Sequence, residues 1–318
     1  MGSGKTVAIK SKQTPLKTRV WNARYLYLLL FFPAVWYIVF QYVPMTGILM
    51  AFEKYKFNAG LFHSPWVGFQ HFERMFNTPD FLRALKNTIV ISLMRLVIEF
   101  SVPMILAVML TEMRFTRTGK VFQTILTLPH FLSWIVLAAI FNIMFANDGT
   151  INAVVTGLGG TRIPFMTNGG YYRAFLYLSS IWKTAGWSAI MYMAVITGID
   201  PELYEAAMLD GASRMQRIRY VTLPHLKEIF VVMLVLKIGS LMAGSFDQIF
   251  TTYNPSVYDV ADTLDTYIYR ITFQKTPDYS FSTAVGLFKS VVNFILLIVS
   301  NWASRAISGT GLFGGNEA

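Results

Sequence analysis

Five charged side chains lie well inside long apolar stretches of this sequence, away from the ends of those stretches, and their chemistry needs an explanation first. They are Arg95, Glu99, Lys183, Lys237 and Lys289. A charge is costly in apolar surroundings, so such groups normally pair with each other or face a water-filled cavity. Arg95 and Glu99 are four residues apart and share a helix face, which predicts an internal ion pair. Lysines without matching acids indicate an anionic substrate, because a bound anion stabilises a buried cation.

Other patterns resemble nucleotide or catalytic sites but are incomplete. Residues 2–6 read Gly-Ser-Gly-Lys-Thr, but a full phosphate-binding loop has a further glycine five residues earlier and follows a strand. The four histidines are scattered, without metal-ligand spacing. Asp259, Asp262 and Asp265 form the one acidic cluster, in a tyrosine-rich segment without basic or metal-binding neighbours. We therefore expect no catalytic residue, no metal site and no cofactor in this chain.

The composition places these residues in a membrane protein. The 318 residues are 54% hydrophobic, 15% aromatic and only 14% charged, whereas a soluble domain carries about 25% charged residues. The chain contains no cysteine, which excludes disulfides, thiolate metal sites and cysteine nucleophiles. We interpret the net charge of +10 as a topology signal and not as nucleic-acid binding.

Six apolar stretches are long enough to cross a bilayer, which takes roughly 20 residues as a helix. The predicted fold is therefore an all-α membrane protein with six transmembrane helices. The spans are expected at residues 25–52, 88–110, 123–145, 174–199, 229–250 and 284–303.

The distribution of Lys and Arg predicts the orientation. With a cytoplasmic N-terminus, the inner segments hold fourteen basic residues and the outer segments nine. We expect a multi-pass protein of a bacterial plasma (inner) membrane with both termini in the cytoplasm. Residues 1–24 form a basic cytoplasmic tail, residues 25–304 the six-span domain, and residues 305–318 a C-terminal tail. The outer connections are residues 53–87, 146–173 and 251–283.

The inner loop of residues 200–228 predicts a helix–glycine–helix unit. Asp200 is a natural N-cap and Pro201 suits the first helical position. Gly211 supplies a left-handed helix end. Ser213, with glutamine three residues later, predicts a capping box for a second helix. Pro224 is expected to break the pattern ahead of the fifth span.

This loop resembles a known signature. Glu-Ala-Ala at 205–207, Asp-Gly-Ala at 210–212 and Leu-Pro at 223–224 are similar to the EAA motif of ABC-importer permeases of the MalF-like superfamily. Residues 128–131, 247–270 and 288–290 resemble the LplB-like polysaccharide permeases within it. The resemblance implies a type I importer fold whose loop couples to an ATPase. The coupling residues it implies are Glu205, Ala206, Ala207, Asp210, Gly211, Arg214, Leu223 and Pro224.

The resemblance also implies partners. These are a second homologous permease, two ATP-binding subunits that carry ATP and Mg²⁺, and an extracytoplasmic solute-binding protein. The lipid bilayer surrounds them, and no nucleic acid is involved. The chain itself is then not an enzyme. Its expected substrate is an oligosaccharide or polysaccharide fragment, which the lysines favour as acidic, such as a uronic-acid oligomer. A neutral sugar, an amino acid, a peptide or phosphate stays open, as do a channel and, least of all, a glycan-processing enzyme.

Polar and aromatic side chains in the last three spans are candidates for the substrate path. Polar stripes suit a water-filled path, although they also join helices, and aromatic rings stack on sugars but more often only pack. Small residues four apart, such as Gly239 and Ala243, predict close helix packing. The path candidates are Lys183, Trp187, Tyr192, Lys237, Ser240, Gly244, Asp247, Lys289 and Asn293.

Overall fold

The computed structural model describes residues 16–113, 116–242, 245–274 and 276–308. Within these ranges the regular structure is helical, apart from one isolated antiparallel bridge between Glu53 and Trp66. The prediction of an all-α chain is therefore confirmed. Among the described helices, four segments are long and apolar enough to cross a membrane: Arg24–Phe52, Pro79–Thr111, Trp134–Gly157 and Tyr279–Ala306.

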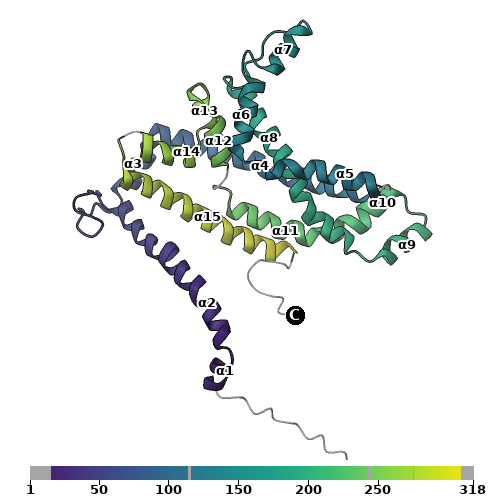
Figure 1. Cartoon of the computed structure of the whole chain (residues 1–318), viewed down its shortest axis with the longest axis horizontal. Helices are drawn as coiled ribbons and strands as arrows, with labels where there is room; N and C mark the ends of the chain where they lie inside the picture. The colour runs from purple at the N-terminus through teal and green to yellow at the C-terminus, as the bar shows by residue number, and fades with distance from the viewer. Residues whose placement is uncertain (1–15, 114–115, 243–244, 275, 309–318) are drawn as a thin grey trace, which may run out of the picture.

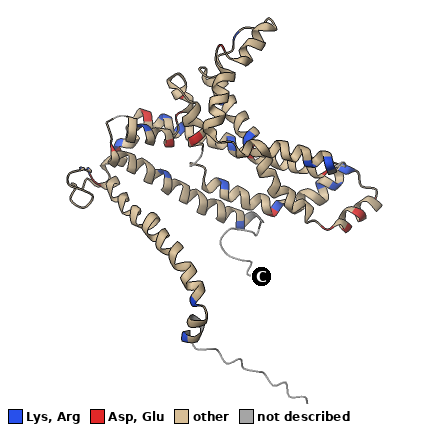
Figure 2. Ribbon diagram, viewed as in Figure 1, with Lys and Arg blue, Asp and Glu red and all other residues tan. Residues whose placement is uncertain are grey.

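The first span stands apart from the other helices (Figure 1). It follows the short α1 (Leu16–Asn22) and consists of α2 (Arg24–Tyr37), η1 (Ile38–Tyr42) and η2 (Val43–Phe52). No residue of α2 or η1 is buried, whereas η2 packs along α15 (Tyr279–Ser308) with Ala51 fully buried. Figure 2 shows that α2 carries no charge beyond its first turn. Within the described part of the chain, α2 and η1 are exposed apolar helix, which is suited to lipid or to another subunit.

Three long helices form the frame of the body: α4 (Pro79–Thr111), α8 (Gly169–Thr197) and α15 (Tyr279–Ser308). Helix α8 packs along α4, and α15 packs along α11 (Leu223–Gly239) and η2. Gly239 permits this second contact, since a Cβ there would overlap Leu297. The predicted close packing is thereby confirmed at Gly239.

The predicted third span is not one helix. It is divided into α5 (Thr116–Thr127), the short η3 (Leu128–Phe131) and α6 (Trp134–Phe145). Pro129 in the first turn of η3 cannot continue the ladder of α5, and Ser133 caps a new helix by accepting from the backbone N–H of Val136 at 3.3 Å. A continuous helix over 123–145 was therefore wrong. Helix α7 (Thr150–Gly157) follows.

The predicted fifth span is broken as well. Helix α11 ends at Gly239, and α12 (Phe246–Thr252) begins after Ser245, which has a left-handed φ of 80°. Asn293 on α15 accepts from the backbone N–H of Met242 at 2.9 Å, satisfying a donor that the broken helix leaves free. A single helix over 229–250 was therefore wrong.

Short helices fill the connections 53–87 and 251–283. They are α3 (Gln70–Phe76), η5 (Pro255–Val257), α13 (Tyr258–Ala261), α14 (Leu264–Tyr269) and η6 (Arg270–Gln274). Their apolar faces complete two of three buried clusters, one around Phe81 and Leu264 and one around Tyr172 and Val257. The third cluster lies deeper along α8, around Ala189 and Leu226.

Candidate coupling loop and translocation path

The loop of residues 200–228 begins with the predicted helix and its predicted glycine end. Asp200 Oδ1 accepts from the backbone N–H of Glu202 at 2.9 Å and caps α9 (Pro201–Leu209). Gly211 has a φ of +77°. Its N–H donates to the Met208 carbonyl at 3.1 Å, and the Ala212 N–H donates to the Ala207 carbonyl at 2.9 Å. These two bonds form a Schellman motif, so the chain leaves α9 in a fixed direction.

The second helix of the unit runs directly into the fifth span. Ser213 and Gln216 form the predicted capping box at α10 (Arg214–Arg217). Helical dihedrals then continue through η4 (Ile218–Thr222), a π-helical turn, into α11. Pro224 lies in the first turn of α11 and does not end the helix, so the expected break there was wrong. The π-helical turn lies just before Pro224. Its wider backbone accommodates the proline ring, which would clash with the preceding carbonyls in a regular α-helix.

Two side-chain contacts fix the unit to the body. Tyr204 on α9 is hydrogen-bonded to Thr222 of η4, with their oxygens 3.0 Å apart. Arg214 donates from Nε to the Glu112 carboxylate, just after α4, at 2.6 Å. Arg214, a predicted coupling residue, is therefore engaged within this chain. These contacts join α9 to η4 and α10 to the end of α4.

The outer surface of the unit carries several exposed apolar side chains. Leu209 is 90% exposed, Met215 70% and Met208 51%. Glu205, Ala206 and Asp210 are exposed, and Glu205 makes no side-chain hydrogen bond or ion pair among the described residues. Figure 2 shows charged residues gathered at this end of the molecule, where α5, α9 and α10 lie. Exposed apolar side chains with a charged rim are typical of a docking surface.

Inside the helix body, Glu99 forms ion pairs with two of the basic residues located in the predicted spans. Its carboxylate lies 3.6 Å from Arg95 Nε, as predicted, and 3.1 Å from Lys237 Nζ. Ser180 donates to the same carboxylate, and Arg95 also donates to the buried Gln248. Lys289 pairs with Asp265 of α14. Lys237 and Lys289 are therefore each paired with an acidic side chain. The sequence-based argument that these lysines are unmatched, and so indicate an anionic substrate, was wrong.

Lys183 has no acid but is fully engaged. Its ammonium donates to the carbonyl oxygens of His130 at 2.7 Å, Leu132 at 2.6 Å and Pro129 at 3.4 Å. These carbonyls lie at the break between α5 and α6, and Pro129 O also accepts from the N–H of Leu132, so Lys183 acts as a cap for η3. Trp187, one turn on, stacks on His130 with ring centroids 4.5 Å apart and planes 3° apart.

The remaining path candidates are in different settings. Tyr192 is 3% exposed in the third buried cluster, so it is a core residue and not the wall of an open path. Asn293 accepts a hydrogen bond from the backbone of Met242 at the break after α11. Ser240 bonds the carbonyls of its own helix, and Asp247 is exposed. Gly244 and Ala243 lie outside the described residues.

Two hollows adjoin at the break in the fifth span. One is an open hollow of about 560 Å³ with Trp134, Phe246, Asp247, Tyr269 and Phe273 in its lining. A smaller one, of about 50 Å³, is lined by the Arg95–Glu99–Lys237 group together with Ser240. Ser245 lines both. Sequence reasoning missed Trp134, Tyr269 and Phe273, because nothing local in the sequence brings α6 and the tyrosine-rich segment together.

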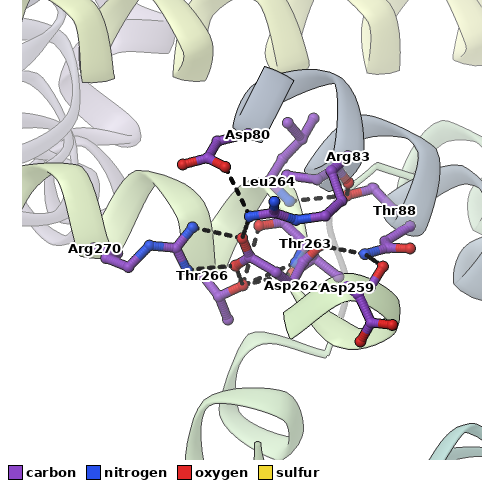
Figure 3. A network of polar contacts seen from close by, with 11 residues as sticks. Asp80, Arg83, Thr88, Asp259, Asp262, Thr263, Leu264, Thr266 and Arg270 are labelled. Atoms are coloured by element: carbon purple, nitrogen blue, oxygen red, sulfur yellow. Dashed lines mark hydrogen bonds and ion pairs between the residues drawn. The ribbon is translucent and has the colours of Figure 1, made fainter. Parts of the chain in front are cut away.

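The three aspartates proposed as an acidic cluster belong to a separate network (Figure 3). Asp262 is fully buried, and its carboxylate accepts hydrogen bonds from both terminal nitrogens of Arg270, at 2.9 and 2.6 Å. Burial acts to lower the pKa of the Arg270 guanidinium, but the bonds to Asp262 and its charge hold that pKa above its ordinary value. The expectation of no basic neighbours was wrong. Asp265 is paired with Lys289, and Asp259 contributes only its backbone oxygen, to Asn87.

This network fixes the segment after the broken span onto α4 and α8. The Asn87 amide donates to the carbonyls of Asp259 and Asp262, at 3.0 and 3.1 Å, and Arg173 donates to Asn87 at 2.9 Å. Thr88 accepts from the N–H of Leu264 at 2.8 Å. Asp262 and Asp265 are neutralised by basic partners and stabilise the fold, so their role is structural. Among the described residues there is also no group of three or more acidic or histidine side chains placed to hold a metal.

A helical membrane body with hollows at a broken span and a projecting helix–glycine–helix loop is the architecture of a transporter permease subunit. The chain belongs to the family described as binding-protein-dependent transport system inner membrane component, which matches residues 101–309. Members of this family are permease subunits of ABC transporters and not enzymes, in agreement with the prediction.

Comparisons with individual proteins place the chain among sugar permeases. It is 38% identical over 305 residues to the polygalacturonan/rhamnogalacturonan transport system permease protein YteP of Bacillus subtilis (strain 168), covering 96% of this chain and 95% of that protein. It is 39% identical over 291 residues to protein LplB of the same organism, covering 91% of each.

A solved structure extends the likeness to the whole fold. It is a bacterial alginate ABC transporter in complex with an alginate pentasaccharide-bound periplasmic protein. The match has a TM-score of 0.86 and 35% identity, and it covers 93% of this chain and 99% of that chain. The predicted type I importer permease fold and the LplB-like resemblance are confirmed.

Proposed function

We propose that this chain forms part of the translocation path of an ATP-driven importer for acidic oligosaccharides or polysaccharide fragments. Two ATP-binding subunits, which carry ATP and Mg²⁺, supply the energy. A second homologous permease chain completes the path, and an extracytoplasmic binding protein delivers the substrate. Both termini lie in the cytoplasm, as the Lys and Arg distribution predicts.

The observation that carries the transport function is the construction of the loop at 200–228. Its exposed apolar end is held rigidly by the Schellman motif at Gly211 and the capping box at Ser213. Its second helix continues without a break into α11. Closure of the ATPase subunits on ATP binding would push this end, and α11 would carry the motion to the hollows around Ser245.

The acidic substrate class is supported by the similar proteins and by the hollow. The names of the two similar proteins concern polygalacturonan and alginate, both acidic polysaccharides. Aromatic faces such as Trp134 and Tyr269 suit sugar rings. In the adjoining hollow, Arg95 and Lys237 outnumber Glu99, which leaves one positive charge. The argument that unmatched lysines indicate an anionic substrate, which was drawn from the sequence, does not support this substrate class.

The test is isolation of the assembled transporter followed by transport. Tagged chain is purified from gently solubilised membranes, and co-purifying proteins are identified by mass spectrometry. We expect an ATPase and a second permease. In proteoliposomes with the binding protein, we expect ATP-dependent uptake of galacturonate oligomers above that of neutral galactose oligomers. Isolation of the chain alone, or flux without ATP, would contradict the importer. Uptake of only neutral oligomers would contradict the acidic substrate.

A further inference from the structure

A second polar cavity lies far from the broken spans, beside the ends of the first and last ones. It has a volume of about 550 Å³. Its walls come from Lys54 and Tyr55 after η2, from α3, and from the turn into α15. These elements lie together at one end of the body, where α3 and the first turns of α15 meet (Figure 1). They belong to the connections 53–87 and 251–283, which the proposed topology places outside the cell.

The walls of this cavity are fixed by contacts between distant parts of the chain. The Tyr55 N–H donates to Ser280 Oγ at 2.8 Å, although 225 positions separate them. Arg74 on α3 pairs with Asp278 at 2.7 Å. Tyr55 and Tyr279 form an edge-to-face pair with ring centroids 6.2 Å apart. The cavity is therefore held in shape before any ligand enters, which lowers the entropic cost of binding.

One lining residue has a buried polar atom without a partner. His71 is 8% exposed, and its Nε2 lies 3.0 Å from the backbone oxygen of Glu53. A carbonyl oxygen only accepts, so Nε2 carries the proton, and in the neutral ring Nδ1 is then an acceptor. Nδ1 is buried and has no hydrogen-bond partner in the described structure. Nδ1 is therefore closed to the cavity, and the contact that His71 provides is the one between α3 and the backbone of Glu53.

The charges of the lining do not cancel. Lys54 and Arg74 face one acid, Asp278, and Arg74 already binds that acid. Lys54 is exposed, and its side chain makes no ion pair or hydrogen bond among the described residues. Glu53, whose backbone oxygen contacts His71, does not itself line the cavity. The lining thus combines an unmatched cation with two tyrosine rings.

We propose that this cavity is an external binding site for an acidic sugar unit of the transported saccharide. Lys54 binds the carboxylate, and Tyr55 or Tyr279 covers the apolar face of the sugar. This inference rests on the proposed import of acidic saccharides and adds a site outside the path. The site gives the saccharide a contact with the permease before it reaches the hollows at Ser245.

The experiment compares saccharide binding to the assembled transporter, without binding protein, in nanodiscs. Isothermal titration uses a galacturonate trisaccharide and the neutral galactose trisaccharide. We expect the wild type to prefer the acidic one, and Lys54→Gln to weaken its binding by about tenfold, the value of one charge-assisted hydrogen bond. Lys54→Glu should weaken it further. Arg162→Gln is the matched control, because Arg162 is exposed on another predicted outer connection and does not line the cavity.

The outcomes separate this site from the proposed function. Equal binding of the acidic trisaccharide by the wild type and Lys54→Gln would overturn the site, even if transport of acidic oligomers proceeds. No saccharide binding, together with weaker attachment of the binding protein in Lys54→Gln, would make the cavity a protein-docking surface and would also overturn it. Absence of acidic-oligomer uptake by wild-type proteoliposomes would instead contradict the proposed function.

Discussion

Lys237 and Glu99 are 138 positions apart in the sequence, yet Lys237 Nζ donates to Glu99 Oε2 at 3.1 Å. The same carboxylate lies beside Arg95, so one acid serves two basic groups and joins α4 to α11. Arg95 and Glu99 are each 10% exposed at the side chain, whereas Lys237 is 49% exposed. The lysine is therefore the most accessible member of this group.

Glu99→Gln should destabilise the helix body. Removal of the carboxylate leaves the buried Arg95 without its counter-charge, which costs about 3 kcal/mol when one partner of a buried pair is lost. Thermal unfolding in detergent, followed by tryptophan fluorescence, measures the loss. Glu228→Gln is the control, since Glu228 is exposed on α11 and makes no side-chain contact among the described residues. Equal melting temperatures for the two variants would contradict a structural role for Glu99.

Local features of the fold were predictable from the sequence, and distant pairings were not. The cap at Asp200, the left-handed Gly211 and the capping box at Ser213 each depend on a few neighbouring residues, and all three were predicted correctly. The partners of Lys237 and Lys289 depend on helices that meet only in the folded chain. No spacing rule reveals them, so the lysines were wrongly interpreted as unmatched.

The broken spans show a second limit of the sequence. Hydropathy reports that a segment is apolar, but it does not report whether the backbone is continuous. The break after α5 is stabilised by Lys183 from α8, and the break after α11 by Asn293 from α15. Both side chains were selected as path residues because they are polar. Their contacts with free backbone groups explain why polar residues are present there.

Lys183→Met should destabilise the break between α5 and α6. The substitution removes three hydrogen bonds from an ammonium to backbone carbonyls, and one charge-assisted bond is worth about 1.5–3 kcal/mol. Lys183→Arg should not restore the wild type, because a planar guanidinium does not converge on three carbonyls as a compact ammonium does. Thermal unfolding and uptake are measured together.

Substrate dependence decides whether Lys183 is a cap or an anion site. A cap predicts that the uptake of acidic and neutral oligomers falls by the same factor in Lys183→Met. A stable variant that loses only acidic uptake would show that Lys183 contacts the substrate. That result would revive the interpretation made from the sequence.

Gly211→Val should impair coupling while leaving the chain in the membrane. Its φ of +77° costs a β-branched residue about 1–2 kcal/mol, although a Cβ at this position meets no atom within 4 Å. The strain would unwind the end of α9 and change the direction of the unit. We expect loss of uptake and of substrate-stimulated ATP hydrolysis in proteoliposomes. Glu205→Lys should give the same loss through the exposed surface.

The control for Gly211 is Gly157→Ala on α7. A Cβ at Gly157 also meets no atom within 4 Å, but the backbone there has no positive φ. The pair therefore separates backbone strain from added volume. Wild-type uptake by Gly211→Val would contradict both the strain argument and the assignment of this loop to coupling.

Gly186→Ala should separate α8 from α5. A Cβ at Gly186 would overlap the carbonyl oxygen of Leu126, a backbone atom that cannot turn aside as a side chain does. The two helices must move apart, and overpacking of this kind costs about 1–3 kcal/mol. Gly286→Ala on α15 makes the same change where a Cβ meets no atom within 4 Å. It should be neutral or slightly stabilising, because alanine favours helix more than glycine does. Thermal unfolding of the two variants in one detergent tests this, and a melting temperature lower for Gly286→Ala than for Gly186→Ala would contradict the close approach of α5 and α8.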